Sequence, residues 1–457
     1  MKRKCLYGLI IYCMLNCMLI CGCGQSLDAN IPGEESSSYT ETISENDAGT
    51  DAEDLLDDDA VTDTGTLSED NIVTDTTLFP ETNGSSDISQ DNSVTAVPEA
   101  VPEVPPAPPA PPSATIVMVG DILLHTKINE SGKYPDGSYN YDHLFANVAE
   151  DIAQADLALV NQEIILGGRE LGLSGYPTFN GAFEVGDALV NAGFDVVLHA
   201  TNHALDKRKT GLLNCLNFWH TSYPEIGVVG IYESQEAQDT IYITEVNGIR
   251  IAILNYTYST NGIPLPDDMP FAVNYLDETQ VREDICLAEE LADFTIVCPH
   301  WGTEYKHEAS ASQKEWARIF AEEGADLCIG THPHVIQPIE WYEAENGNQM
   351  LVYYSIGNFI NSTSRKGSGA AERMCGGMAQ ITLTKEESGS VVISHYDVEP
   401  LVTQVLTGTG LITTYKFSDY TPELAELNEI RNQDPAFTYE YCEQIFKYFG
   451  LDTDDAD

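Results

Sequence analysis

The sequence predicts an α/β domain with both parallel and antiparallel strands. From residue 114 onward, short apolar runs alternate with segments of helical pattern, as expected for buried strands connected by helices. Two hairpin-like stretches interrupt this alternation, so a mixed arrangement fits better than a purely parallel, doubly wound sheet. A long acidic and proline-rich stretch precedes the domain and has the composition of a disordered tail.

The first element is an export signal, expected at residues 1–22. A basic start is followed by an almost wholly apolar run, Cys5–Ile20, that is short for a membrane-spanning helix. The run ends in a sequence that resembles a bacterial lipoprotein cleavage box, where the small residue Gly22 precedes Cys23. We therefore expect lipidation of Cys23 and anchoring at the extracellular face of the bacterial cell membrane. The alternative is an uncleaved signal anchor.

The second element is a linker, expected at residues 23–112. Residues 24–112 contain 21 of the 73 Asp and Glu residues and no Lys or Arg, and residues 24–97 have too few large apolar side chains to fold. Residues 98–112 contain eight prolines and should form a stiff polyproline II spacer. This segment is interpreted either as a stalk that lifts the domain from the membrane or as inert low-complexity sequence.

The folded domain is expected at residues 113–405. Its apolar runs predict successive strands, in the order TIVMVGD, DLALVNQE, DVVLHATNH, RIAILNY, FTIVCPHWG, DLCIGTHPH and MLVYYSIGNF. The segments between them predict helices at Phe183–Ala192, Gly211–His220, Glu278–Leu291 and Ser312–Glu323. Turn residues at Asn247-Gly248 and Ser388-Gly389 predict the two hairpins. Residues 406–457 are expected to form a helical C-terminal appendage.

Net charge and hydropathy each exclude one class of protein. The formal net charge is −52, which repels phosphate backbones and excludes nucleic-acid binding by a basic surface. No stretch after residue 23 approaches the roughly 20 apolar residues of a spanning helix, so a polytopic membrane protein is excluded as well.

Polar residues that suit metal binding follow several of the predicted strands. Any one of them has an ordinary explanation, because a lone histidine is more often a hydrogen-bonded core residue than a ligand. Together, at strand ends, they predict a site. The carboxylate, amide and imidazole groups favour Mn, Fe or Zn, and they suffice for two divalent ions, with Glu163 as a candidate bridge. The candidates are Asp121, Glu163, Asn202, His203, His300, His332 and His334.

The spacing of His332 and His334 suggests how two of these side chains could converge. Residues two apart in an extended chain point the same way, so both rings are expected to face one cation, with Pro333 stiffening the segment. His300 follows Pro299 at a predicted strand end, which aims its ring at the same edge.

Six motifs contain these candidates or lie near them: Gly120-Asp121, Asn161-Gln162-Glu163, Thr201-Asn202-His203-Ala204-Leu205-Asp206, His300–Tyr305, Gly330–Gln337 and Tyr354–Phe359. Two of them, HWGTEY and GTHPHVIQ, are long and specific. Together the motifs resemble the CapA-type poly-γ-glutamate capsule biosynthesis family, itself similar to the calcineurin-like metallophosphatases. The resemblance covers roughly residues 114–404 and implies a mixed β-sandwich flanked by helices, with the site at one edge.

The resemblance also implies a role for each matching residue. Asp121 and His334 would bind one metal ion, Glu163 would bridge, and Asn202, His300 and His332 would bind the second. His203 would act as a general acid, and Asn358, Trp301 and Glu304 would support the site from outside. The phosphatase pattern has a histidine two residues after the first Asp, whereas the nearest here is His125. Either His125 reaches round from its loop, or the first metal has fewer ligands.

Three functional hypotheses follow. The first is an extracellular dimetal hydrolase of a phosphoester or amide bond in a capsule or cell-envelope polymer, where the metals activate water and His203 protonates the leaving group. The second is a non-catalytic, metal-stabilised subunit of a capsule polymer synthesis or export complex. The third, an acidic surface protein with a vestigial site, is disfavoured by the intact ligand set. Binding a polyanion would require metal ions or a local basic patch to offset the acidic domain, for example Lys306, Arg365, Lys366 and Arg373.

Overall fold

The computed structural model describes residues 110–363 and 368–451. The chain divides into two units, residues 1–107 and residues 108–457, and the elements below belong to the second unit. The export signal expected at residues 1–22, the lipidation site Cys23 and all but the last three residues of the linker lie outside the described residues, as do Arg365 and Lys366.

The first sheet is mixed. Its strands are β1 Ser113–Ile122, β2 Leu157–Asn161, β3 Val196–Leu198, β4 Gly227–Val229, β11 Asn358–Ile360, β12 Cys375–Lys385, β13 Val391–Val405 and β14 Ile412–Lys416. Their order is β14–β13–β12–β1–β2–β3–β4, and β11 pairs with the end of β1. β1 to β4 are parallel, whereas β12 to β14 pair antiparallel.

The second sheet has a parallel centre and antiparallel edges. Its strands are β5 Tyr242–Val246, β6 Ile249–Thr257, β7 Phe294–His300, β8 Leu327–Ile329, β9 Ile339–Glu343 and β10 Gln349–Tyr353. Their order is β5–β6–β7–β8–β10–β9. β6, β7, β8 and β10 run parallel, and β5 and β9 close the two edges as antiparallel strands.

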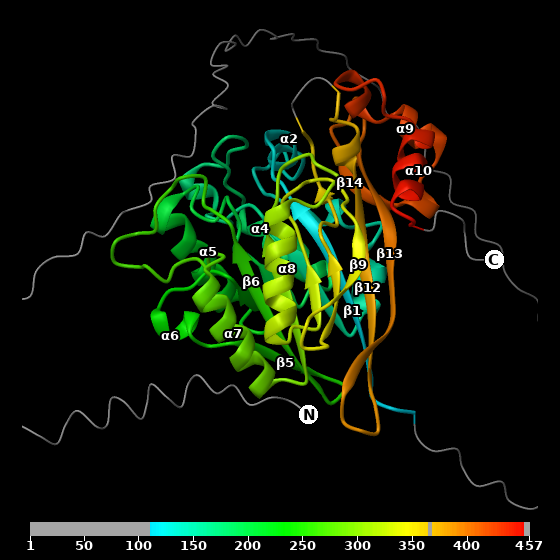
Figure 1. The fold of residues 1–457 in the computed structure, drawn as a ribbon. Helices are drawn as coiled ribbons and strands as arrows, with labels where there is room; N and C mark the ends of the chain where they lie inside the picture. The colour runs from blue at the N-terminus through cyan, green and yellow to red at the C-terminus, as the bar shows by residue number, and fades with distance from the viewer. Residues whose placement is uncertain (1–109, 364–367, 452–457) are drawn as a thin grey trace, which may run out of the picture. The chain divides into compact units, whose positions relative to one another are not determined.

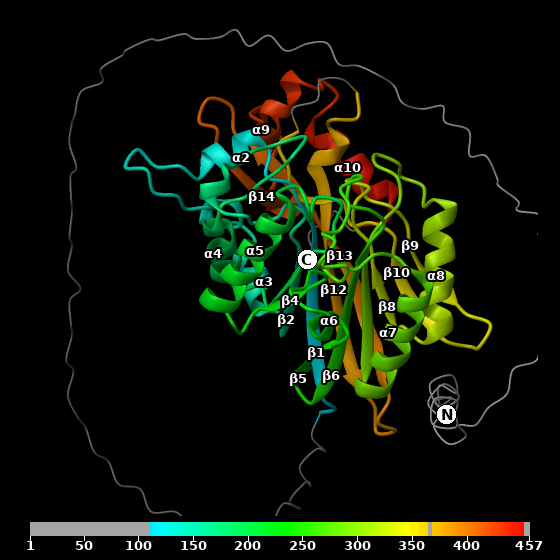
Figure 2. The same cartoon turned by 90° about the vertical axis from the view of Figure 1, so that its left-hand side faces the viewer.

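Helices lie outside the two sheets (Figures 1 and 2). The α-helices are α2 Thr126–Ser131, α3 Ala149–Gln154, α4 Phe183–Ala192, α5 Arg208–Ser222, α6 Gln235–Gln238, α7 Glu278–Leu291, α8 Ala311–Glu323, α9 Pro422–Glu426 and α10 Tyr439–Tyr448. Short 3-10 helices occur at Asp142–Leu144, Arg169–Leu171, Glu372–Met374, Phe417–Asp419 and Glu429–Asn432. In the part of the chain that the structure describes, no helix is long and apolar enough to cross a membrane.

The main core lies between the two sheets. Sγ of Cys298 on β7 is 3.8 Å from Sδ of Met118 on β1, so the inner faces of the two sheets are in contact. A second core lies on the outer face of the second sheet, where Phe320 of α8 and Ile285 of α7 cover buried residues of β6, β7 and β10. The predicted two-sheet α/β sandwich with flanking helices is therefore confirmed.

Local sequence accounts for the positions of several elements. Asn247 and Gly248 both have positive φ, at +51° and +79°, which forms the tight turn between β5 and β6. Ser310 and Gln313 form a reciprocal capping box at the start of α8. Helices α4 and α7 have the bounds that the apolar pattern predicts, and the other two predicted helices fall within α5 and α8.

The C-terminal segment differs from the helical appendage expected at residues 406–457. β14 pairs antiparallel with β13 and extends the first sheet beyond residue 405. Phe417 and Phe446 are buried in the main core, with their ring centroids 5.0 Å apart. The strand was missed because ITTYK is a short run whose partner, β13, is identified only by long-range pairing.

Candidate metal centre

The candidate residues come together where the strands of both sheets end. Asp121 lies near the end of β1, Glu163 follows β2, and Asn202 and His203 lie in the loop after β3. His300 is the last residue of β7, and His332 and His334 lie in the loop after β8. All of these side chains are buried, which makes the site an internal cluster at the edge of the sandwich.

Close backbone packing places Asp121. A Cβ atom on Gly120 would lie 1.9 Å from the carbonyl oxygen of Gly357, so only glycine allows this approach. The approach lets β11 pair with the end of β1 and brings Asn358 opposite Asp121. The Gly-Asp pair, a weak signal in the sequence, therefore has a specific structural cause.

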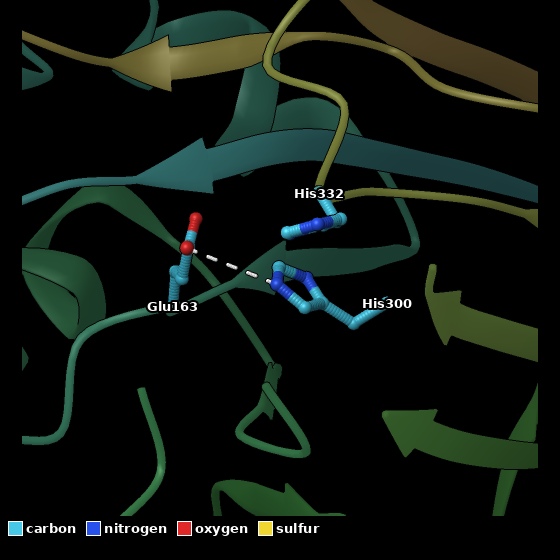
Figure 3. A group of neighbouring side chains, drawn as sticks. All are labelled: Glu163, His300 and His332. Atoms are coloured by element: carbon cyan, nitrogen blue, oxygen red, sulfur yellow. Dashed lines mark ion pairs between the residues drawn. The ribbon is translucent and has the colours of Figure 1, made fainter. Parts of the chain in front are cut away.

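Glu163 lies at the centre of the cluster, and its carboxylate is surrounded by histidine rings (Figure 3). Oε1 is 3.8 Å from Nε2 of His300 and 3.9 Å from Nε2 of His203. Oε2 is 3.8 Å from Nδ1 of His334. Figure 3 shows the rings of His300 and His332 close to each other beside this carboxylate. Their centroids are 4.8 Å apart and their planes are tilted by 59°. The nitrogen–oxygen separations of 3.8–3.9 Å exceed hydrogen-bond length.

His332 and His334 converge by a mechanism that differs from the extended segment expected. Both have positive φ, at +97° and +60°, a region that non-glycine residues rarely occupy. The segment is a turn, and its ring centroids are 5.6 Å apart. The turn is fastened by hydrogen bonds from the backbone N–H of His332 to Oδ2 of Asp121 and from that of Tyr305 to the carbonyl oxygen of Pro333.

Hydrogen bonds orient the ligand candidates. Nδ1 of His334 is 3.0 Å from Oδ2 of Asp121 and 3.0 Å from Oδ1 of Asn358, so Asn358 has the supporting position expected of it. Nδ2 of Asn161 donates to Oδ1 of Asp121 over 2.7 Å. Oδ1 of Asn202 is 3.0 Å from Nε2 of His300.

His203 stands beside the cluster and is held by a carboxylate. Its Nδ1 lies 2.7 Å from Oδ2 of Asp206, which also accepts the backbone N–H of Phe179. The ring of Phe179 meets the imidazole edge-on, with centroids 4.7 Å apart. Because Asp206 occupies Nδ1, the other ring nitrogen faces Glu163, which is the geometry of a positioned proton donor.

Burial dominates the electrostatics of the site. It raises the pKa of Glu163 well above its usual value, and the nearby Asp121 raises it further against the opposing effect of His334. Burial also lowers the pKa of His300 and His332 well below their usual value. For His334 burial lowers the pKa, but Glu163 and Asp121 outweigh this effect and raise it to about 9.

Unpaired buried atoms provide a test of whether metal ions fit this cluster. Both carboxylate oxygens of Glu163 and Nδ1 of His332 are buried without a hydrogen-bond partner. Such groups are costly unless something else satisfies them, and a divalent cation would do so. Two sets of ligand atoms, each lying within 4.8 Å of one another, share Glu163: one with His300 and His332, the other with Asp121 and His334. The residues therefore fit divalent metal, and Glu163 is the residue that the two groups share.

Two of the residues predicted from the sequence, His125 and Glu304, lie at the periphery of the cluster. His125 is in the loop after β1, with its ring edge-on to Phe179, and it belongs to none of the ligand groups found among the described residues. Its pKa is lowered to about 4 by burial and by the nearby His334. Glu304 is exposed but lies in a third ligand group with His332 and His334.

Trp301 faces away from the cluster. Because side chains alternate along an extended chain, His300 points to the site and Trp301 to the second core. There its indole donates to the carbonyl oxygen of Tyr354 over 2.9 Å, and its ring stacks on Phe320. Its backbone N–H donates to the carbonyl oxygen of Thr331, so Trp301 supports the site through the backbone.

Several neighbours of the cluster had no role assigned from the sequence. Asn161 and Asp206 lie inside the quoted motifs, so their presence beside the candidates was the available signal. Thr331 has its Oγ1 3.0 Å from Nδ1 of His300. Tyr258, 45% exposed, places its ring 4.6 Å from that of His332, and no motif pointed to it.

Comparisons with known proteins agree with the motif pattern. The sequence profile of a family described as "Bacterial capsule synthesis protein PGA_cap" matches residues 115–363, more than half of the chain. The chain is 34% identical to "PGA biosynthesis protein CapA" of Bacillus subtilis (strain 168) over 173 residues, covering 38% of this chain and 44% of the relative. It is 27% identical to "Capsule biosynthesis protein CapA" of Bacillus anthracis over 255 residues, covering 54% and 59%. The match thus spans about half the length of each relative.

Among solved structures, one similar chain is the NAD nucleotidase (NadN) of Haemophilus influenzae. The two chains are 13% identical, the match covers 75% of this chain and 65% of the nucleotidase chain, and the TM-score is 0.42.

Proposed function

The chain belongs to the bacterial capsule synthesis protein PGA_cap family, and from this premise we propose that it is a metal-dependent hydrolase acting on a phosphoester or amide bond of a capsule or cell-envelope polymer. One observation carries the proposal: the buried carboxylate of Glu163 has two unpaired oxygens, and ring nitrogens of two ligand candidates, His300 and His334, each lie 3.8 Å from one of them. That spacing is too long for hydrogen bonds and leaves room for cations between the groups.

The residues divide into those that hold metal and those that support them. Glu163 would be shared by two ions, with Asp121 and His334 on one side and His300, His332 and Asn202 on the other. Divalent ions such as Mn, Fe or Zn would lower the pKa of water and offset negative charge on the substrate. Asn161, Asn358 and Thr331 fix the rotamers of the ligands through the hydrogen bonds described above.

His203 would move the proton. Asp206 holds its Nδ1, which leaves Nε2 free to give a proton to the leaving group on the Glu163 side of the cluster. The ring of His203 is buried and packs edge-on against Phe179, which limits its contact with water.

We also propose that the domain acts outside the cell, anchored in the membrane through a lipid on Cys23. The basic start, the apolar run and the Gly22-Cys23 pair support this location, and the proline-rich segment would keep the domain at a distance from the membrane. The partners proposed are a capsule or envelope polymer and other subunits of a capsule synthesis complex.

The proposal is tested by metal analysis followed by a hydrolysis panel. The purified chain should contain tightly bound divalent metal and should hydrolyse either a phosphodiester such as bis(p-nitrophenyl) phosphate or a γ-glutamyl amide. His203→Gln should retain metal and lose turnover, and His220→Gln, at an exposed position on α5, should behave like wild type. A chain that binds no divalent metal would contradict the proposal. A chain that binds metal but hydrolyses none of these substrates would favour the non-catalytic subunit.

A further inference from the structure

A buried arginine beside the metal-ligand cluster is not matched by a carboxylate. Arg373, in the 3-10 helix Glu372–Met374, is 6% exposed, and within residues 110–363 and 368–451 no Asp or Glu forms an ion pair with it. Four other arginines pair with acidic side chains, namely Arg169, Arg250, Arg282 and Arg318. Arg208 and Arg431 also form no ion pair within the described residues, but both are less buried than Arg373. A buried arginine without a carboxylate partner is unexpected, because its charge is then left uncompensated.

The contacts of Arg373 fix its guanidinium with neutral groups. Nε donates to the carbonyl oxygen of Gly369 over 3.0 Å, and Nη1 donates to Oγ1 of Thr363 over 3.1 Å. The flat face lies over the ring of Tyr305, with Cζ 4.5 Å from the ring centroid. These contacts orient the side chain without neutralising its charge, and among the described residues they use two of its five N–H donors.

Arg373 is linked to the metal-ligand cluster through Asn358 and Tyr305. Its carbonyl oxygen accepts from Nδ2 of Asn358 over 2.9 Å, and Oδ1 of the same Asn358 lies 3.0 Å from Nδ1 of His334. The ring of Tyr305 has its centroid 6.0 Å from that of His334. Because the guanidinium lies over this same ring, it is placed beside the cluster on the side of Tyr305.

We propose that Arg373 is a specificity-determining residue that binds an oxyanion of the substrate, a phosphate or a carboxylate, next to the bond that the metal centre acts on. This inference rests on the proposed function for the identity of the site. The remaining donors of the guanidinium form a planar fork that matches two oxygens of such a group. A substrate anion would supply the counter-charge that the protein does not provide.

The proposal narrows the substrate class to molecules with an anionic group adjacent to the scissile bond. The proposal also explains how an acidic domain could bind a polyanion. The net charge of the domain repels such a molecule, so binding requires a local positive charge at the site.

The test measures binding of two probes, inorganic phosphate and the dipeptide γ-glutamylglutamate, by titration calorimetry on the full chain before and after treatment with EDTA. Arg373→Gln should weaken binding of at least one probe by about 10–100-fold, the range for hydrogen bonds to charged groups. Metal content should stay at the wild-type value. The probe that is affected identifies phosphate or carboxylate as the recognised group. Arg318→Gln, which removes one positive charge from α8 on the outer face of the second sheet, is the matched control and should bind like wild type.

A second variant covers the case in which Arg373→Gln does not fold. Arg373→Lys keeps the charge and loses the planar fork, so it should weaken binding by at least about fivefold. Wild-type affinity for both probes in a folded variant would overturn the proposal, and so would failure of the wild-type chain to bind either probe. A wild-type chain that lacks metal but binds a probe through Arg373 would refute the proposed function while supporting this inference.

Discussion

Asp206 determines the orientation of His203, because its Oδ2 accepts the Nδ1 proton of the imidazole over 2.7 Å and thereby turns Nε2 toward Glu163. Asp206 is itself fixed by the backbone N–H of Phe179, which donates to the same oxygen over 2.7 Å. The carboxylate thus acts through His203, as a positioning residue.

Asp206→Asn should lower turnover while leaving the metal in place. A neutral amide does not stabilise the doubly protonated imidazole as the carboxylate does, so His203 becomes a poorer proton donor. The loss should reach about 10²–10⁴-fold, the range for general acid catalysis. Steady-state rates and metal content are measured together, with Asp267→Asn at an exposed loop position as control. Metal lost in parallel with activity would show that Asp206 supports the ligands instead of the proton donor.

His332→Ala and His203→Ala should separate metal binding from proton transfer. Removing His332 takes one nitrogen from the group with Glu163 and His300, so the affinity for metal should fall by at least about tenfold. His203→Ala should keep its metal, because that ring is held by Asp206 outside the two groups that share Glu163. Elemental analysis after dialysis against buffers of graded free metal concentration measures the metal content of both variants. Equal metal loss in the two variants would assign His203 to the ligands.

Trp301→Phe should reduce stability and leave the metal centre intact. The change removes the indole hydrogen bond to Tyr354 and part of the stacking on Phe320, which together should cost about 1–3 kcal/mol in the free energy of unfolding. Urea denaturation and metal content are the readouts. A variant of unchanged stability with reduced metal would place the role of Trp301 at the site itself.

His199 should make the domain less stable in mild acid. Its Nε2 accepts the indole N–H of Trp219 over 3.0 Å, and burial lowers its pKa to about 3. In the unfolded chain an ordinary histidine has a pKa of about 6.5, so below that pH the unfolded state binds a proton that the folded state does not. Stability should therefore fall by up to about 1.4 kcal/mol per pH unit between roughly pH 6.5 and 3.

Urea midpoints at pH 7.5 and 5.5 measure this effect. His199→Gln should show a smaller loss than wild type on acidification, and His220→Gln, on the exposed side of α5, should show the wild-type loss. Identical pH dependence in all three chains would mean that His199 does not contribute.

Cys23→Ala should leave an unlipidated precursor. Intact mass and incorporation of labelled fatty acid would be compared with those of wild type in a bacterial host, with Cys21→Ala as the matched control. Acyl chains that persist near this end of Cys23→Ala would show that the cleavage site lies elsewhere.

The residues that end the strands, and the chemistry that they carry, could be predicted from local sequence patterns. Buried strands appear as apolar runs, and because parallel strands place their carboxyl ends at one edge, the position of Asp121, Glu163 or His300 after such a run was enough to expect convergence. Helices α4 and α7 were likewise predicted, since their apolar periodicity is local.

Relationships that depend on distant contacts could not be predicted in this way. The left-handed turn at His332 and His334 is held by Asp121 and by the loop after β7, so the local spacing suggested an extended segment that does not form. β14 is a strand because β13 lies beside it. The role proposed for Arg373 depends on its burial and on its lack of an ion pair among the described residues, and neither can be predicted from the sequence. A local pattern predicts what a segment prefers, whereas pairing, burial and unpaired charge depend on which distant segments it meets.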